Sequence, residues 1–279
     1  YKKTIHYDHS NKEIIKKRRK KLGIDWSLLH NKNSEIHHVN FIEKILATLL
    51  SKVSNFVPEG GIWMNTQRPE WNDANNALVG NGISMVTLYY LRRFVNFFNS
   101  LLEKTDLISV EISFELNEFF NDLHHALNNN KKVIDSSISD QNRKKIVDLL
   151  GVAGSNFRNK IYDNGFSGTK SAIGIKEIKD FTILLLQYID HSIDSNKRKD
   201  KLYHAYNLLT IKKDRISVSY LPEMLEGQVA VLSSGYLSSK ENLEVLNKAL
   251  QISGRKPVTR AAEGVVGNAF TDIIRARFS

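Results

Sequence analysis

Apolar and polar residues alternate with a helical period along most of the chain. Between Asn40 and Val53 the apolar residues recur three and four positions apart, which places them on one face of a helix. The segment 84–102 is apolar almost all round, so we expect a helix that is buried on most sides. The same pattern predicts further helices over about residues 11–22, 108–128, 140–162, 171–194, 199–211, 222–234 and 238–252.

Signals for strands are few. Arg215–Tyr220 alternates polar and apolar residues just before Pro222, which predicts one short strand. Strands and helices do not alternate along the chain, which argues against a parallel α/β sheet. A serine at 238 followed by Glu241 marks the start of the last helix. We therefore predict an all-α fold built from helical hairpins.

The chain divides by composition near its end. Residues 1–253 are predicted to form one α-helical domain, with residues 1–35 as a basic N-terminal arm. Residues 254–279 turn to Ala, Gly, Val and Arg, and Lys256 is their only lysine. This tail is interpreted either as a helix over about 258–277 or as a segment foreign to the natural protein, and no function is assigned to it.

Composition excludes several classes of site and location. The chain of 279 residues has no cysteine, which rules out disulfides, thiolate nucleophiles and cysteine-based zinc sites. The side chains of adjacent residues on a helix point about 100° apart, so the pairs His37-His38 and His124-His125 are poor joint metal ligands. No apolar run approaches the roughly 20 residues needed to cross a bilayer, and no signal peptide is visible. We expect a cytoplasmic protein without a membrane partner or cofactor.

The net charge of +10 and the pI near 9.5 raise the question of a polyanionic partner. One dense cluster, Lys16–Lys21, lies in the first predicted helix. A charge run of this kind is more often a solvated helix face than a phosphate-binding surface, so nucleic acid is not the favoured partner. A non-enzymatic helical module that binds nucleic acid or another polyanion remains the alternative function.

The segment 60–80 differs in composition from the rest of the chain. It holds two of the three tryptophans, two carboxylates and four asparagines between two strongly apolar helices. Indole rings stack on the apolar faces of sugars, and amides, carboxylates and guanidinium groups bond to sugar hydroxyls. We predict that the following residues bind an oligosaccharide substrate: Trp63, Gln67, Arg68, Glu70, Trp71 and Asn72.

Part of this segment resembles a known family. The run Glu70–Gly80, which begins Glu-Trp-Asn-Asp-Ala-Asn-Asn, resembles the Asp-Trp-Asn-Asp-Gly-Met-Asn…Val-Gly loop of the cellobiose and chitobiose phosphorylase family of inverting glycoside hydrolases. Glu70 replaces the first aspartate of the family loop, and Ala74 replaces its glycine. The resemblance implies that the chain forms part of an (α/α)6 toroid. Because 279 residues are short for twelve helices, it also implies a fragment of a larger enzyme, active or inactive.

The resemblance also implies a chemical role for Asp73, which matches the general acid of the family. Such an acid must stay protonated near neutral pH, above the usual aspartate pKa of about 3.9, and Glu70 and the tryptophans would raise the pKa. In this family the opposite face of the sugar is attacked either by water, which a second carboxylate activates, or by inorganic phosphate, which is then a co-substrate; the sequence leaves both alternatives open. The competing interpretation is structural: Trp71 belongs to the core, and Asn72 and Asp73 cap the next helix.

A second carboxylate is the candidate for the base. Glu223 and Glu226 are one helical turn apart in an otherwise apolar segment. Burying a carboxylate unpaired is costly, so Glu226 either belongs to a site or pairs with a cation. We predict a base role for Glu226; the alternative is that it complements the dipole at a helix N-terminus.

Overall fold

The computed structural model describes residues 8–30, 35–64 and 80–252. The α-helices are α1 (His9–Leu22), α2 (Phe41–Val53), α4 (Met85–Leu102), α5 (Phe114–Asn128), α6 (Asp140–Asn164), α7 (Ile175–Ser195), α8 (Leu225–Ser233) and α9 (Ser239–Ile252). Two short 3-10 helices are η1 (Ile24–Ser27) and η2 (Lys131–Asp135). The strands are β1 (Phe56–Val57), β2 (Gly61–Trp63), β3 (Gly82–Ser84), β4 (Ser109–Ser113), β5 (Lys170–Gly174), β6 (Tyr206–Ile211) and β7 (Ile216–Tyr220).

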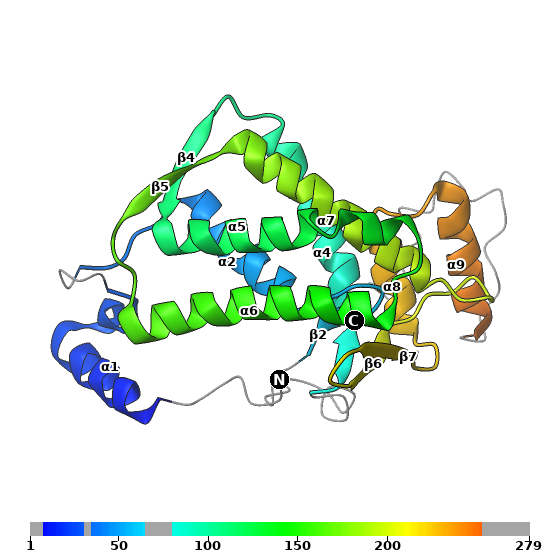
Figure 1. Cartoon of the computed structure of the whole chain (residues 1–279), viewed down its shortest axis with the longest axis horizontal. Helices are drawn as coiled ribbons and strands as arrows, with labels where there is room; N and C mark the ends of the chain where they lie inside the picture. The colour runs from blue at the N-terminus through cyan, green and yellow to red at the C-terminus, as the bar shows by residue number, and fades with distance from the viewer. Residues whose placement is uncertain (1–7, 31–34, 65–79, 253–279) are drawn as a thin grey trace.

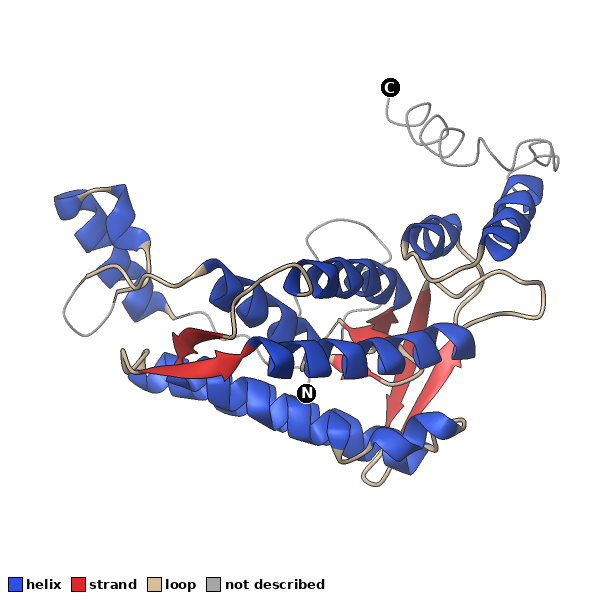
Figure 2. Ribbon diagram, turned by 90° about the horizontal axis from the view of Figure 1, so that it is seen from above, coloured by secondary structure: helices blue, strands red, loops and turns tan. Residues whose placement is uncertain are grey.

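The fold is mixed helix and sheet. Five antiparallel strands form a curled sheet in the order β1-β2-β3-β6-β7, and β4 and β5 form a separate two-stranded sheet. Figure 2 shows both sheets among the helices, with α6 running alongside as the longest helix. The prediction of an all-α, (α/α)6-toroid-like domain is therefore wrong.

The strands that the sequence analysis missed are short, and they are strands because they pair with partners elsewhere in the chain. The segment 199–211 was predicted as a helix, but Tyr206–Ile211 forms β6, which pairs with β3 on one side and β7 on the other. A short apolar run fits a buried strand and a helix equally well when only its periodicity is considered. Ser109–Ser113 alternates polar and apolar residues and forms β4, although the helix was predicted to begin at 108. The strand predicted at Arg215–Tyr220 is confirmed as β7.

Several predicted helices are confirmed together with their caps. Asn40 caps α2, where its Oδ1 accepts a hydrogen bond from the Glu43 amide at 2.8 Å. At the start of α9, Ser238 Oγ accepts from the Glu241 amide at 3.3 Å, and the Glu241 carboxylate accepts from the Ser238 amide at 3.1 Å. This reciprocal pair is a capping box. Helix α4 departs from the expectation of burial on most sides, because Phe97 is 58% exposed.

The register of the sheet separates two hydrophobic clusters. Paired residues in antiparallel strands point to the same face, so Trp63, Ile83 and Asn207 share one face. This face packs on α6 in a small cluster with Val147. The opposite face carries Tyr206 and belongs to the main core, where α2, α4, α5 and α7 pack together.

Helix α1 stands apart from this body. It buries none of its residues and packs on η1, and Figure 1 shows it at the end of the molecule opposite α9. Within the part of the chain that the structure describes, no helix combines the length and apolar character needed to cross a bilayer.

Candidate functional site

Most of the predicted sugar-binding residues lie outside the described residues. These are Gln67, Arg68, Glu70, Trp71 and Asn72, together with the proposed acid Asp73. The residues that flank segment 65–79 are held close together by two hydrogen bonds. The Gly80 amide donates to the Met64 carbonyl at 3.0 Å, and the Met64 amide donates to the Gly82 carbonyl at 2.9 Å. The segment therefore leaves and rejoins the fold at one place, beside Trp63.

Trp63 is described, and most of its indole is buried. Its side chain lies in the cluster between the sheet and α6, and its Nε1 donates to the Gly80 carbonyl at 3.3 Å. This bond joins β2 to the residue that follows segment 65–79. Only 6% of the surface of Trp63 is exposed, so little of its indole ring is available for a sugar ring to stack on. Its main contribution is to pack between the sheet and α6.

A cleft of about 290 Å³ lies against this tryptophan. It runs between the end of α2, strand β2 and the middle of α6. We call it the Trp63 cleft, and its lining residues are Ser54, Asn55, Trp63, Val147, Asp148, Gly151, Val152, Gly154, Ser155, Asn156 and Arg158. The cleft thus lies next to the place where segment 65–79 leaves the sheet.

Two glycines of α6 explain how the cleft forms. A Cβ on Gly154 would lie 2.8 Å from Ser54 Cβ, so the absence of a side chain lets α6 approach the end of α2 closely. A Cβ on Gly151 would meet nothing within 4 Å, because Gly151 faces open space. A glycine inside a helix costs about 1 kcal/mol relative to alanine, and at Gly151 no neighbouring atom requires it. Because Gly151 has no side chain, the cleft is deeper at this position.

The polar groups of the cleft have the chemistry of a hydroxyl- or phosphate-binding site. Asn156 and Asn55 supply amides, and Asp148, which pairs with Lys144, supplies a carboxylate. Arg158 supplies a guanidinium group, and its Nη2 donates to Ser155 Oγ at 3.3 Å. Amides and carboxylates bond to sugar hydroxyls, and a guanidinium group can hold a phosphate oxygen pair.

Glu226 does not line this cleft. It is exposed in the first turn of α8, where its carboxylate complements the helix dipole. Burial raises the pKa of the Tyr206 hydroxyl, and Glu226 beside it raises that pKa further. Because Tyr206 points to the face of the sheet opposite Trp63, the described structure does not bring Glu226 and Trp63 together.

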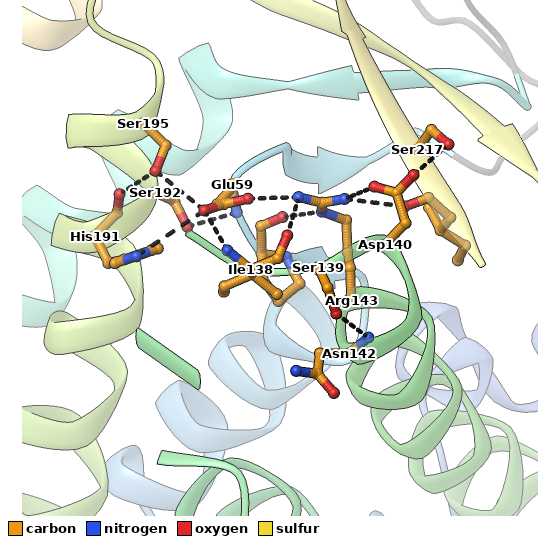
Figure 3. Close-up of polar contacts among 12 residues, drawn as sticks. Glu59, Ile138, Ser139, Asp140, Asn142, Arg143, His191, Ser192, Ser195 and Ser217 are labelled. Carbon is orange, nitrogen blue, oxygen red and sulfur yellow. Dashed lines mark hydrogen bonds and ion pairs between the residues drawn. The ribbon is translucent and has the colours of Figure 1, made fainter. Parts of the chain in front are cut away.

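A buried ion pair, which the sequence did not reveal, joins the β1–β2 turn to α6, two of the elements that border the cleft. Glu59 lies in the turn between β1 and β2, and Arg143 lies in the first turns of α6; both are buried (Figure 3). The Arg143 guanidinium donates to the Glu59 carboxylate and to Asp140 Oδ1 at 2.5 Å. It also donates to three main-chain carbonyls, those of Pro58, Ile138 and Ile216. All five guanidinium N–H groups are therefore used, which leaves Arg143 no capacity to bind a ligand.

Glu59 is equally well bonded. Its Oε1 accepts from the Ile138 amide at 2.8 Å, its amide donates to Ser192 Oγ at 3.0 Å, and its carbonyl accepts from Asn196 Nδ2 at 2.9 Å. Its φ is 60°, a left-handed conformation that is uncommon for a residue with a side chain. The surrounding hydrogen bonds hold this left-handed turn in place and tie β1 and β2 to α6.

The Glu59–Arg143 pair also reaches the edge of the sheet. Ser217 of β7 donates to Asp140 Oδ2 at 2.7 Å. This hydrogen bond, together with Arg143, lowers the pKa of Asp140. The proline and glycines around Glu59 are typical of a loop, but nothing local in the sequence identifies a partner so far along the chain.

Within residues 8–30, 35–64 and 80–252, no group of three or more histidine, aspartate or glutamate side chains is arranged to hold a metal ion. No protein-family model matches the sequence, and no curated protein matches it. The function must therefore be argued from the chemistry of the cleft and of segment 65–79.

Proposed function

We propose that the chain binds an oligosaccharide in the Trp63 cleft and cleaves its glycosidic bond with Asp73 as the general acid. The proposal is supported by one observation above others: segment 65–79, which carries the family-like Trp-Asn-Asp run, joins the fold beside a polar cleft. The toroid that the resemblance implied is no part of the proposal, because the fold is mixed. The proposal depends on the short sequence resemblance and on the cleft's chemistry.

The proposed reaction is an attack by inorganic phosphate. A phosphate oxygen forms a bond to the anomeric carbon while the bond from that carbon to the bridging oxygen breaks. Asp73 gives its proton to the leaving oxygen, so the products are a glycosyl phosphate and a sugar with a free hydroxyl. Arg158 is the group in the cleft that would hold phosphate. Phosphate needs no general base, which fits a cleft that Glu226 does not line.

The experiment is an incubation of the purified chain with cello- and chito-oligosaccharides, with and without phosphate. We expect glycosyl phosphate to form only when phosphate is present, and we expect Asp73→Asn to lower the rate at least about 100-fold, the usual contribution of a general acid. Asp214→Asn is the matched control, because Asp214 is exposed on the turn between β6 and β7. Equal rates in Asp73→Asn and Asp214→Asn would remove Asp73 from the proposed role.

A further inference from the structure

Helix α1 carries a row of cations on one face. The residues Lys12, Lys16, Arg19 and Lys20 line a shallow hollow of about 440 Å³, and we call them the basic stripe. Their spacing of three and four residues places them on one side of the helix. Ile15 is the one apolar residue among the described residues that line the hollow. Glu13 lies 3.9 Å from Lys16 in an exposed ion pair, so the stripe is a cationic surface with one neighbouring carboxylate.

Helix α1 is stabilised by its own caps and not by burial of its side chains in the core. Asp8 caps its start, where Oδ1 accepts from the Asn11 amide at 2.9 Å, and Gly23 ends it with a φ of 102°. None of its residues is buried, and it carries seven lysines and arginines but one carboxylate, Glu13. Basic residues in the last turn complement the helix dipole, but this does not account for Lys12 and Lys16, which lie earlier.

We propose that the basic stripe binds the phosphate backbone of a nucleic-acid duplex without reading its sequence. Lys12 and Lys20 are eight residues apart, which is about 12 Å along a helix. One strand of a duplex carries a phosphate about every 3.4 Å of its axis, so the stripe spans about four phosphates. Four cations face this length, one for each phosphate.

The composition of the stripe argues for a duplex over other anionic partners. Among the described residues that line the hollow there is no aromatic side chain, so they offer no platform on which the bases of a single strand would stack. The stripe is also poor in apolar residues, whereas a helix that lies in a lipid surface needs an apolar face to bury. Ile15 and Arg18 are half-buried, whereas the four cations of the stripe are all exposed.

The test is the binding of the full chain to a fluorescent mixed-sequence DNA duplex, measured by anisotropy over a range of salt concentrations. Four phosphate contacts predict a slope of about −3.6 in log K against log salt, or about 150-fold weaker binding at 200 mM than at 50 mM salt. The quadruple variant Lys12→Gln, Lys16→Gln, Arg19→Gln, Lys20→Gln should bind at least about tenfold more weakly at low salt and lose most of this slope. Glutamine keeps helix propensity, so circular dichroism should be unchanged.

A second quadruple variant serves as the matched control. It changes four exposed lysines away from α1 to glutamine: Lys131, Lys132, Lys199 and Lys213. We expect its affinity to stay within about twofold of the wild type. Equal losses in the two variants would attribute binding to net charge alone and would overturn the proposal, as would an absence of duplex binding. Retention on phosphatidylcholine–phosphatidylserine vesicles in place of duplex would overturn it too. The carbohydrate proposal is unaffected by any of these results.

Discussion

Arg143 and Glu59 place two opposite charges inside the protein, where each depends on the other. The guanidinium gives all its N–H groups to acceptors, and Glu59 sits in a left-handed turn that its own hydrogen bonds hold. Removing one partner of such a pair leaves a buried charge without compensation. The pair therefore fixes the β1–β2 turn against α6, and with it two walls of the Trp63 cleft.

Replacing Arg143 with methionine should lower the free energy of unfolding by about 3–5 kcal/mol, because the buried Glu59 side chain then loses its charged partner. Urea denaturation measures the loss. Arg215→Met is the matched control, since the pair between Arg215 and Asp214 is largely exposed, and it should cost less than about 1 kcal/mol. Adding Glu59→Gln to Arg143→Met should cost less than the two single changes together. Similar stabilities for Arg143→Met and Arg215→Met would show that the buried pair does not support the fold.

At the scale of single residues, the sequence predicted local features and missed distant ones. The capping roles of Ser238 and Glu241 were readable because both partners lie within one helical turn. The contact between Glu59 and Arg143 was not readable, because it depends on how α6 packs against β1 and β2, and no local pattern encodes that packing.

Helix α6 offers a paired test at the scale of one element. Gly151→Ala should stabilise the protein by about 0.5–1 kcal/mol, because alanine favours a helix and Gly151 has room for a methyl group. The added methyl group would enter the cleft and weaken oligosaccharide binding. Gly154→Ala should destabilise by about 1–3 kcal/mol, because its Cβ would overlap Ser54. Thermal unfolding and calorimetric titration measure both effects; unchanged sugar affinity in a stabilised Gly151→Ala variant would place the ligand elsewhere.

The stability that the N-terminal cap of helix α9 contributes should depend on pH. The Lys197 side chain and the amide and hydroxyl of Ser238 lower the pKa of Glu241 from 4.5 to about 2. Because the folded pKa is below the unfolded value, this stabilisation is complete above pH 4.5 and is lost as the pH falls from 4.5 towards 2. An NMR titration of the Glu241 carboxyl carbon should give a midpoint near 2, and Glu241→Gln should remove this part of the acid sensitivity. A midpoint near 4.5 would contradict the capping account.

At this same scale, helices were easier to predict than strands. Helices α2, α6 and α9 have enough turns to show their period, and their caps are local. Strands β1, β2 and β3 have two or three residues each, too few for alternation to be visible. Strand β3 pairs with β6, which is more than a hundred residues further along the chain, and β1 and β2 join the sheet through β3. The all-α prediction failed for this reason.

For the whole molecule, the structure separates a packed body from a basic helical arm. The body holds the sheet, the Glu59–Arg143 pair and the Trp63 cleft, whereas α1 buries nothing and lies at one end (Figure 1). The two proposed activities therefore use different surfaces. The division of the chain into a domain over 1–253, with a basic arm over 1–35, and a tail over 254–279 stays a prediction.

The central claim is that an oligosaccharide occupies the Trp63 cleft, and hydrogen exchange measured by mass spectrometry tests it most directly. With saturating cello- or chito-oligosaccharide, we predict slower exchange in peptides that cover residues 54–63 and 147–158, which line the cleft. Peptides that cover β7 and the start of α8, residues 216–226, should be unchanged. No protection in either cleft peptide, or protection confined to 216–226, would contradict the account.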